Sequence, residues 1–151
     1  MSKRRFCAIA VSSYLARLKT GIIDYGAGNL RSVHKAVETL EFPAEIVKRP
    51  SELDGIDTLI LPGVGAFGDC VHHLREQDLW EPIREWIAAD KPYFGICLGY
   101  QVLFESSEEA PGIEGLGAFK GEVVRFPKSD LKVPHMGCLL YTSPSPRDKH
   151  R

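Results

Sequence analysis

Cys97 lies in the stretch Gly95–Gly99, with one glycine two residues before it and another two residues after it. An apolar run, Pro92–Ile96, precedes the cysteine, and a helical pattern, Leu98–Glu105, follows it. A side chain at such a sharp strand-to-helix turn is held out from the sheet, which is the geometry of a nucleophile elbow with sulfur in place of serine oxygen. The N–H groups at the start of the helix favour the reactive thiolate. The alternative is a buried cysteine beside a tight turn, because free cysteine is among the most buried residue types.

A second glycine-rich segment, Gly63–Gly68, could serve the same chemistry. Acyl transfer to a thiolate creates a negatively charged tetrahedral oxygen, which backbone N–H groups can stabilise. Gly63, Val64 and Gly65 are candidates to present such groups, because glycine lets peptide planes turn and approach closely. The N–H of Leu98, directly after the cysteine, is a second candidate donor. The alternative is a close-packed turn that binds nothing.

The same segment also matches the pattern G-x-G-x-x-G, which is typical of dinucleotide-binding sites. In those sites the glycines belong to the first strand-to-helix turn, and an acidic residue ends the next strand. Here the loop follows the third predicted strand, and the next strand ends at Cys97, with Asp90 before that strand. The pattern therefore favours an oxyanion hole over a dinucleotide site, and no cofactor is predicted.

Alternating strands and helices must position these residues. The predicted strands are Thr20–Asp24, Ala44–Lys48, Thr58–Leu61 and Lys91–Ile96, with a strand-like stretch at Glu122–Phe126. The predicted helices are Leu30–Leu40 with Asn29 as cap, a helix capped by Asp69 that reaches Gln77, and Trp80–Ala89, in addition to the helix after Cys97. This alternation predicts an α/β fold, a mostly parallel sheet with helices on both faces. Active sites lie at the carboxyl ends of such strands, where three glycine-rich turns would meet: Gly26–Gly28, Gly63–Gly68 and Gly95–Gly99.

The composition narrows the functional class. Hydrophobic residues make up 44% of the 151 residues, charged residues 26%, and the net charge is −1, so nothing indicates nucleic acid or an anionic membrane as a partner. No apolar run reaches the length of a membrane span. The cysteines are scattered and form no CxxC pair, which argues against a metal site and a disulfide framework and fits the reducing cytoplasm: Cys7, Cys70, Cys97 and Cys138.

Four segments in order resemble the glutaminase subunit of imidazole glycerol phosphate synthase: Ile23–Ser32, Leu61–Gly68, Gly95–Gly112 and Val133–Gly137. The resemblance implies a class I glutamine amidotransferase of histidine biosynthesis. Cys97 would attack the side-chain amide of glutamine and release ammonia. The ammonia would pass to a (β/α)₈-barrel cyclase subunit, the partner in a heterodimer, which makes imidazole glycerol phosphate and an aminoimidazole carboxamide nucleotide.

The resemblance also assigns roles that spacing alone does not. Gln101 and Glu109 match positions that hold the glutamine substrate, and Glu109 could pair with its ammonium group. Without the resemblance, a polar helix face and a solvated acidic run would be the simpler interpretations. The resemblance further implies that a peptide near Val64 must reorient before glutamine is hydrolysed, so that Gly63–Gly65 would be both oxyanion hole and switch.

The chain departs from this family after Gly137. The family's catalytic histidine and glutamate come from a later motif that this chain does not contain, and none of the five histidines is assigned as the base: His34, His72, His73, His135 and His150. We therefore expect an N-terminal fragment with little or no glutaminase activity. It would consist of an N-terminal extension rather than an export signal (1–19), a partial amidotransferase domain (20–137) and a non-family tail, disordered or foreign (138–151). The alternatives are another cysteine-dependent amidotransferase or hydrolase, and a non-catalytic fragment that only binds the partner.

Overall fold

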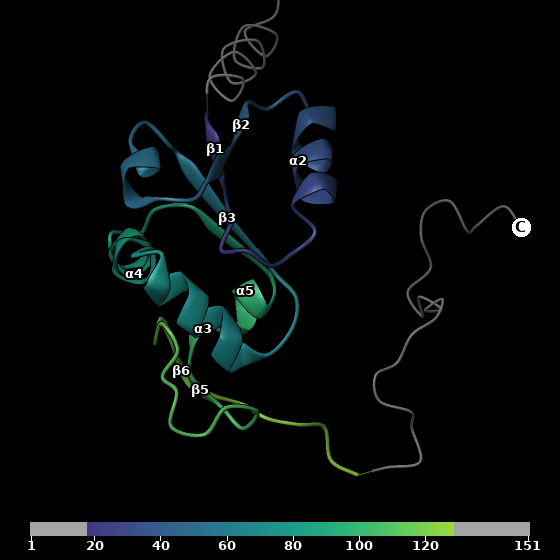
Figure 1. Cartoon of the computed structure of the whole chain (residues 1–151), viewed down its shortest axis with the longest axis vertical. Coiled ribbons are helices and arrows are strands. Elements are labelled where there is room, and N and C mark those ends of the chain that lie inside the picture. The colour runs from purple at the N-terminus through teal and green to yellow at the C-terminus, as the bar shows by residue number, and fades with distance from the viewer. Residues whose placement is uncertain (1–17, 129–151) are drawn as a thin grey trace, which may run out of the picture.

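A computed structural model describes residues 18–128 of the chain (Figure 1). Several expectations fall outside these residues: those for the start of the N-terminal extension, for Val133–Gly137, for the tail, and for Cys7, Cys138, His135 and His150.

Within the described residues, the central sheet has four parallel strands, as the sequence predicts. They are β1 (Thr20–Ile23), β2 (Ala44–Val47), β3 (Thr58–Gly63) and β4 (Tyr93–Cys97), in the order β2-β1-β3-β4. The two central strands, β1 and β3, are almost wholly buried. Their continuous apolar sequences fit that place, because strands of a parallel sheet are covered on both faces.

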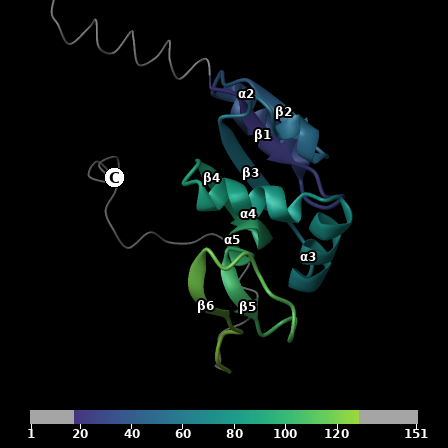
Figure 2. The same ribbon diagram turned by 90° about the vertical axis from the view of Figure 1, so that its left-hand side faces the viewer.

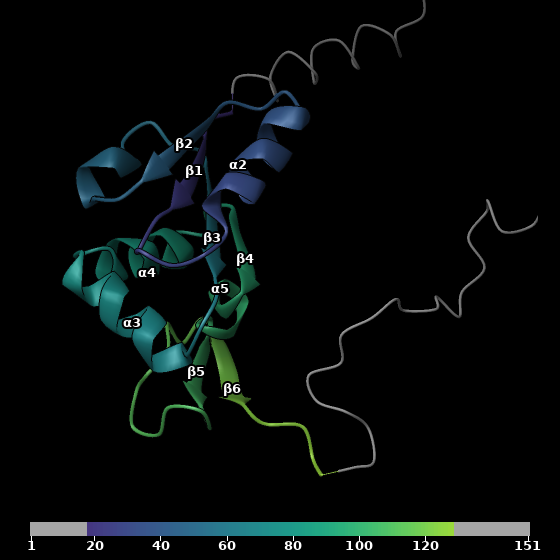
Figure 3. The same cartoon turned by 45° about the vertical axis from the view of Figure 1, so that its right-hand side comes forward.

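Helices cover both faces of the sheet, again as predicted. They are α2 (Leu30–Thr39), α3 (Phe67–Glu76), α4 (Trp80–Ala88) and the single turn α5 (Leu98–Gln101), with a short 3₁₀ helix, η1 (Pro50–Leu53). Figure 3 shows α2 on one side of the sheet and α3 and α4 on the other. No residue of α2 is buried, whereas α3 and α4 both bury apolar side chains. The core therefore lies between the sheet and the α3–α4 layer.

The starts of two helices show what local sequence can predict. Asn29 caps α2 as expected, because its side-chain oxygen accepts a hydrogen bond of 3.2 Å from the N–H of Ser32. The predicted cap of α3 by Asp69 is wrong, since the helix begins at Phe67 and Asp69 lies in its first turn. The Phe67 N–H instead donates to the carboxylate of Glu109, at 2.9 Å, from 42 residues further along the chain.

The helix predicted to extend to Glu105 is only four residues long. The chain continues as β5 (Phe104–Ser107), which pairs in parallel with β6 (Phe119–Val123), and Figure 2 shows this pair next to α5. The N–H groups of Leu116 and Phe119 donate to the carbonyl groups of Val102 and Leu103, at 2.6 and 3.0 Å. Those carbonyl groups are thus used by an incoming segment rather than by a longer helix. The strand predicted at Glu122–Phe126 begins earlier than expected and ends at Val123.

Candidate active site

Cys97 is the last residue of β4 and forms the sharp turn into α5. Its backbone has φ 56° and ψ −110°, and its side chain is exposed. A non-glycine residue with positive φ is uncommon, and such a conformation costs about 1–3 kcal/mol unless the surroundings hold it. The strand-to-helix elbow predicted from the sequence is therefore present, and the alternative of a buried cysteine is wrong.

Two glycines make this elbow possible, because neither position has room for a β-carbon. A β-carbon on Gly99 would overlap the carbonyl oxygen of Leu61 in β3 and lie 2.8 Å from the carbonyl carbon. A β-carbon on Gly95 would overlap the carbonyl oxygen of Gly99. The first turn of α5 is thus packed directly on the backbone of β3 and β4, and this packing fixes the position of Cys97.

The glycine-rich segment after β3 lies beside the cysteine. Gly63 is the direct partner of Cys97 in the β3–β4 ladder, and Leu98 begins α5 on the other side of the turn. Gly65 has φ +107°, a conformation that favours glycine, and the side chain of Val64 is 57% exposed. The structure therefore brings the cysteine, Gly63 and Leu98 to one edge of the sheet, with Val64 and Gly65 continuing from it.

The turn after β1 reaches the same edge. Its backbone is held by Asp24, whose carboxylate accepts a hydrogen bond of 3.0 Å from the N–H of Gly26. Gly28, at φ +118°, packs against the end of β3, where an added β-carbon would lie 3.5 Å from the carbonyl oxygen of Pro62. The expectation that three glycine-rich turns meet at the carboxyl edge is thus confirmed.

Gln101 and Glu109, the two residues proposed to hold glutamine, line one pocket of about 650 Å³. Its other lining residues are Ser107, Glu108, Val123, Val124 and Arg125. The Glu109 carboxylate also accepts the N–H of Phe67 (2.9 Å), the first residue of α3. The Glu109 carboxylate therefore has two roles: it borders the pocket, and it holds the chain just after the Gly63–Gly65 segment.

The electrostatic contribution of α5 is smaller than the sequence suggested. A helix dipole grows with the number of aligned peptides, and α5 has four residues instead of the predicted eight.

Polar side chains that the sequence analysis did not single out lie beneath the elbow. The Tyr93 hydroxyl donates to the carbonyl of Gly99 at 2.7 Å, which holds α5 on β4. Burial raises the pKa of the Cys70 thiol to about 11, and it also raises the pKa of the Tyr25 hydroxyl, with the neighbouring Cys70 adding to the rise. The three side chains come from α3, β4 and the turn after β1, so no local spacing could have predicted the cluster.

Comparison with known proteins places this geometry in a family. The profile described as "Glutamine amidotransferase class-I" matches residues 21–142. The chain belongs to the class-I glutamine amidotransferase family. Its elbow cysteine and the adjacent glycine-rich segment both lie within the matched residues.

Curated relatives narrow the likeness within the amidotransferase family. The "Imidazole glycerol phosphate synthase subunit HisH" of Rhodopirellula baltica is 52% identical over 117 residues, which is 77% of this chain and 57% of the relative. The protein of the same name from Desulfitobacterium hafniense (strain DSM 10664 / DCB-2) is 51% identical, over 78% of this chain and 55% of the relative. The amidotransferase chain thus spans a little over half the length of these relatives.

Solved structures agree with this fold. A chain titled "Crystal structure of glutamine amidotransferase" superposes with a TM-score of 0.61 at 25% identity, covering 70% of this chain and 56% of that one. A putative peptidase E from Listeria monocytogenes superposes with a TM-score of 0.52 at 20% identity, over 60% of this chain and 52% of that one. The second likeness shows a shared fold only.

The histidines within residues 18–128 of the amidotransferase chain lie on its helices. His34 contacts the carbonyl oxygen of Ala44 at 3.3 Å, and His72 pairs with Glu76 at 3.2 Å, one turn further along α3. His73 is exposed on α3, and its ring stacks near that of Tyr25, with 6.5 Å between the ring centroids. We assign none of the three as the catalytic base.

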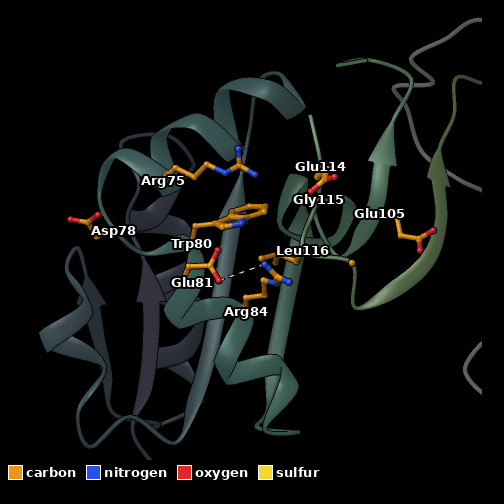
Figure 4. Close-up of a pocket in the computed structure, with 10 residues that line it drawn as sticks. Arg75, Asp78, Trp80, Glu81, Arg84, Glu105, Glu114, Gly115 and Leu116 are labelled. Atoms are coloured by element: carbon orange, nitrogen blue, oxygen red, sulfur yellow. Dashed lines mark ion pairs between the residues drawn. The ribbon is translucent and has the colours of Figure 1, made fainter. Parts of the chain in front are cut away.

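A cavity of about 880 Å³ lies away from the predicted amidotransferase site (Figure 4). It separates α3 and α4 from the loop that contains Glu114 and Leu116. Its guanidinium groups are already engaged, since Arg84 pairs with Glu81 at 3.6 Å and Arg75 lies 5.1 Å from the centre of the Trp80 ring. Neither Cys70 nor Cys97, the cysteines within residues 18–128, lines it, so the cavity is not part of the site around Cys97.

No group of three or more histidine, cysteine or acidic side chains within residues 18–128 of the amidotransferase chain could hold a metal ion. None of the helices in this part is long and apolar enough to cross a membrane.

Proposed function

We propose that the chain is the nucleophile-bearing part of a glutaminase that supplies ammonia for imidazole glycerol phosphate synthesis. The observation that carries this proposal is the position of Cys97, exposed at a positive-φ elbow and paired directly with Gly63. The family description supplies glutamine as the substrate class, and the names of the relatives, at about 50% identity, supply imidazole glycerol phosphate synthesis.

In this proposal the Cys97 thiolate attacks the carbonyl carbon of the glutamine side-chain amide. The carbonyl oxygen becomes an oxyanion beside the backbone of Gly63–Gly65 and the N–H of Leu98, whose hydrogen bonds stabilise it. The tetrahedral species then collapses: the carbon–nitrogen bond breaks, the leaving nitrogen takes a proton, and ammonia departs. A glutamyl thioester remains on Cys97, and water hydrolyses it to glutamate and free thiol. The proton transfers need a base, which is a histidine in the family that the sequence resembles.

Gln101 and Glu109 would hold the substrate in their shared pocket. The Glu109 carboxylate would pair with the ammonium group of glutamine, and the Gln101 amide would bond its polar groups. Support for this part comes from the pocket that both residues line, at the end of α5 and therefore close to the elbow.

The partner in this proposal is a cyclase subunit that receives the ammonia, and the complex would work in the cytoplasm. The word "subunit" in the names of the relatives indicates a complex. A relative from Emericella nidulans, "Imidazole glycerol phosphate synthase hisHF", is 47% identical over 77% of this chain, which covers 21% of that protein. A longer protein thus carries the matching segment, which fits a glutaminase joined to a second activity. Free thiols at Cys70 and Cys97 fit a reducing compartment.

A labelling experiment tests the assignment of nucleophile and substrate. The chain is incubated with a chloroketone analogue of glutamine, and the modified cysteines are mapped by mass spectrometry. We expect modification of Cys97, slowed by glutamine but not by asparagine, and lost in Cys97→Ser; buried Cys70 serves as the internal control. Modification that asparagine or a peptide slows better than glutamine would favour a different cysteine hydrolase on this fold. Equal protection by all these compounds would refute a glutamine site.

A further inference from the structure

The Tyr25 hydroxyl is a buried polar group that the proposed mechanism does not use. The tyrosine is 1% exposed, and its hydroxyl has no hydrogen-bond partner of ordinary geometry among residues 18–128. A buried hydroxyl without a partner loses its hydrogen bonds to water and gains none in return, which is unfavourable. A group left in this state directly below a candidate active site calls for a functional explanation.

This hydroxyl lies against the backbone of the proposed oxyanion segment. A β-carbon added to Gly63 would lie 2.7 Å from the Tyr25 oxygen, so the hydroxyl directly faces the strand at this residue. The N–H of Val64 lies next to the same oxygen and opposes the rise in its pKa. The Cys70 thiol is the other polar neighbour. The hydroxyl can therefore accept from the Val64 N–H once that peptide rotates, and it can donate to the sulfur of Cys70.

The segment above the hydroxyl has the freedom to make that rotation. The Val64 side chain is more than half exposed, so little packing holds it in place. Gly65 follows at φ +107°, where no side chain restricts the backbone, and an added β-carbon would meet nothing within 4 Å. The segment is fixed again only at Phe67, by the hydrogen bond to Glu109.

We propose that the Tyr25 hydroxyl is a positioning group that competes with the oxyanion for the Val64 N–H. A peptide N–H that points down to the buried hydroxyl is not available to an oxygen above Cys97. The hydroxyl thus lowers the fraction of molecules whose oxyanion hole is complete, and Tyr25 sets the basal reactivity of the site. This inference rests on the proposed function, because it takes Gly63–Gly65 as the oxyanion segment.

The variant Tyr25→Phe tests the competition, because it keeps the ring and removes only the oxygen. The chloroketone analogue of glutamine places a carbonyl oxygen in the hole, so its maximal rate of reaction with Cys97 depends on the Val64 N–H. We expect this maximal rate to rise roughly two- to tenfold, the factor that corresponds to one net hydrogen bond. The concentration for half-maximal rate should stay the same, since the oxyanion exists only in the transition state. Iodoacetamide alkylates the thiolate without forming an oxyanion, so its rate should not change.

Amide hydrogen exchange at Val64 gives a second readout that does not depend on glutamine. Exchange at this amide should be faster in Tyr25→Phe than in the wild type. The control is Trp86→Phe, which removes a different buried hydrogen bond, from the indole N–H to the carbonyl of Pro92 at 3.0 Å, before the start of β4. A loss of stability alone would change both variants alike, whereas the proposal requires a change at Val64 in Tyr25→Phe only.

The outcomes separate the two proposals. An unchanged or slower reaction of Tyr25→Phe with the chloroketone, or unchanged exchange at Val64, would overturn the role of Tyr25 and leave the glutaminase assignment standing. If glutamine fails to protect Cys97 in the wild type, the glutaminase assignment fails. The exchange at Val64 then still decides whether the Tyr25 hydroxyl holds this amide.

Discussion

The packing of α5 on β3 predicts opposite effects for the same substitution at two helical glycines. Gly99→Ala places a methyl group on the carbonyl of Leu61, and relief of the overlap requires α5 to move by about 1 Å. Overpacking of this kind costs about 1–3 kcal/mol, and the usual helical preference for alanine over glycine returns about 1 kcal/mol at most. The cost should lie near the top of that range, because the obstacle is the backbone of Leu61 rather than a side chain. We therefore expect the free energy of unfolding to fall by about 2 kcal/mol.

Gly68→Ala in α3 is the matched control. Its β-carbon would meet the tip of the Ile113 side chain at 3.0 Å, and a side-chain tip can rotate away. The helical preference should therefore dominate and stabilise the protein by about 0.5–1 kcal/mol. At about 4 °C for each kcal/mol, thermal unfolding followed by circular dichroism should show a fall of roughly 8 °C for Gly99→Ala and a rise of roughly 2–4 °C for Gly68→Ala.

The same pair links the packing to reactivity. Misplacement of a reacting group by about 1 Å can cost on the order of 100-fold in rate, so Gly99→Ala should react far more slowly at Cys97 with the chloroketone, even at temperatures where it is fully folded. Gly68→Ala should react at the wild-type rate. The reasoning is refuted if both variants shift the melting temperature in the same direction, or if folded Gly99→Ala reacts as fast as the wild type.

Two further predictions concern groups near the elbow. Glu109→Ala removes the acceptor for the Phe67 N–H and should lower the free energy of unfolding by about 1 kcal/mol, whereas Glu109→Gln keeps an oxygen there and should lose less. Equal urea midpoints for the two variants would contradict this role of the carboxylate. Burial raises the pKa of Cys70 from 9.0 to about 11, so the folded chain holds this proton more tightly than the unfolded chain. The stability that the protonated Cys70 thiol contributes should be complete below pH 9 and lost as the pH rises to 11. Urea unfolding should therefore show that the free energy of unfolding falls less steeply over this pH range in Cys70→Ala than in the wild type. Identical pH dependences of the two proteins would exclude the effect.

Local sequence predicted the features that depend on a few neighbouring residues. The capping of α2 by Asn29 needs only a side-chain oxygen three residues before a free N–H. The elbow at Cys97 follows from two glycines at a fixed spacing, because the turn brings backbone atoms closer than a β-carbon allows. The parallel sheet follows from alternating apolar strands and helices.

The errors arose where a distant segment outcompetes a local preference. Asp69 has the right side chain for a helix cap, but α3 begins two residues earlier, at Phe67. There the Glu109 carboxylate accepts the N–H of the first helical residue. The apolar pattern after Cys97 fits a longer helix. The carbonyl groups of Val102 and Leu103 instead accept hydrogen bonds from a distant segment, at Leu116 and Phe119. Neither contact has a signal in the local sequence, because its partners are separated by 14 or more residues along the chain.

This difference between local and distant contacts explains how the site is built. Cys97 and the segment beside it are positioned by backbone packing, at Gly63, Gly95 and Gly99, so their arrangement follows from where side chains are absent. The groups that would adjust the proposed chemistry are side chains from other elements, with Tyr25 below Gly63 and Glu109 at the far end of the glycine-rich segment. Substitutions at the glycines should therefore abolish the geometry as a whole, whereas substitutions at Tyr25 and Glu109 should change rates and affinity in a folded site. The sequence shows the first set directly and indicates Glu109 through its resemblance to a family, whereas Tyr25 is found only in the three-dimensional structure.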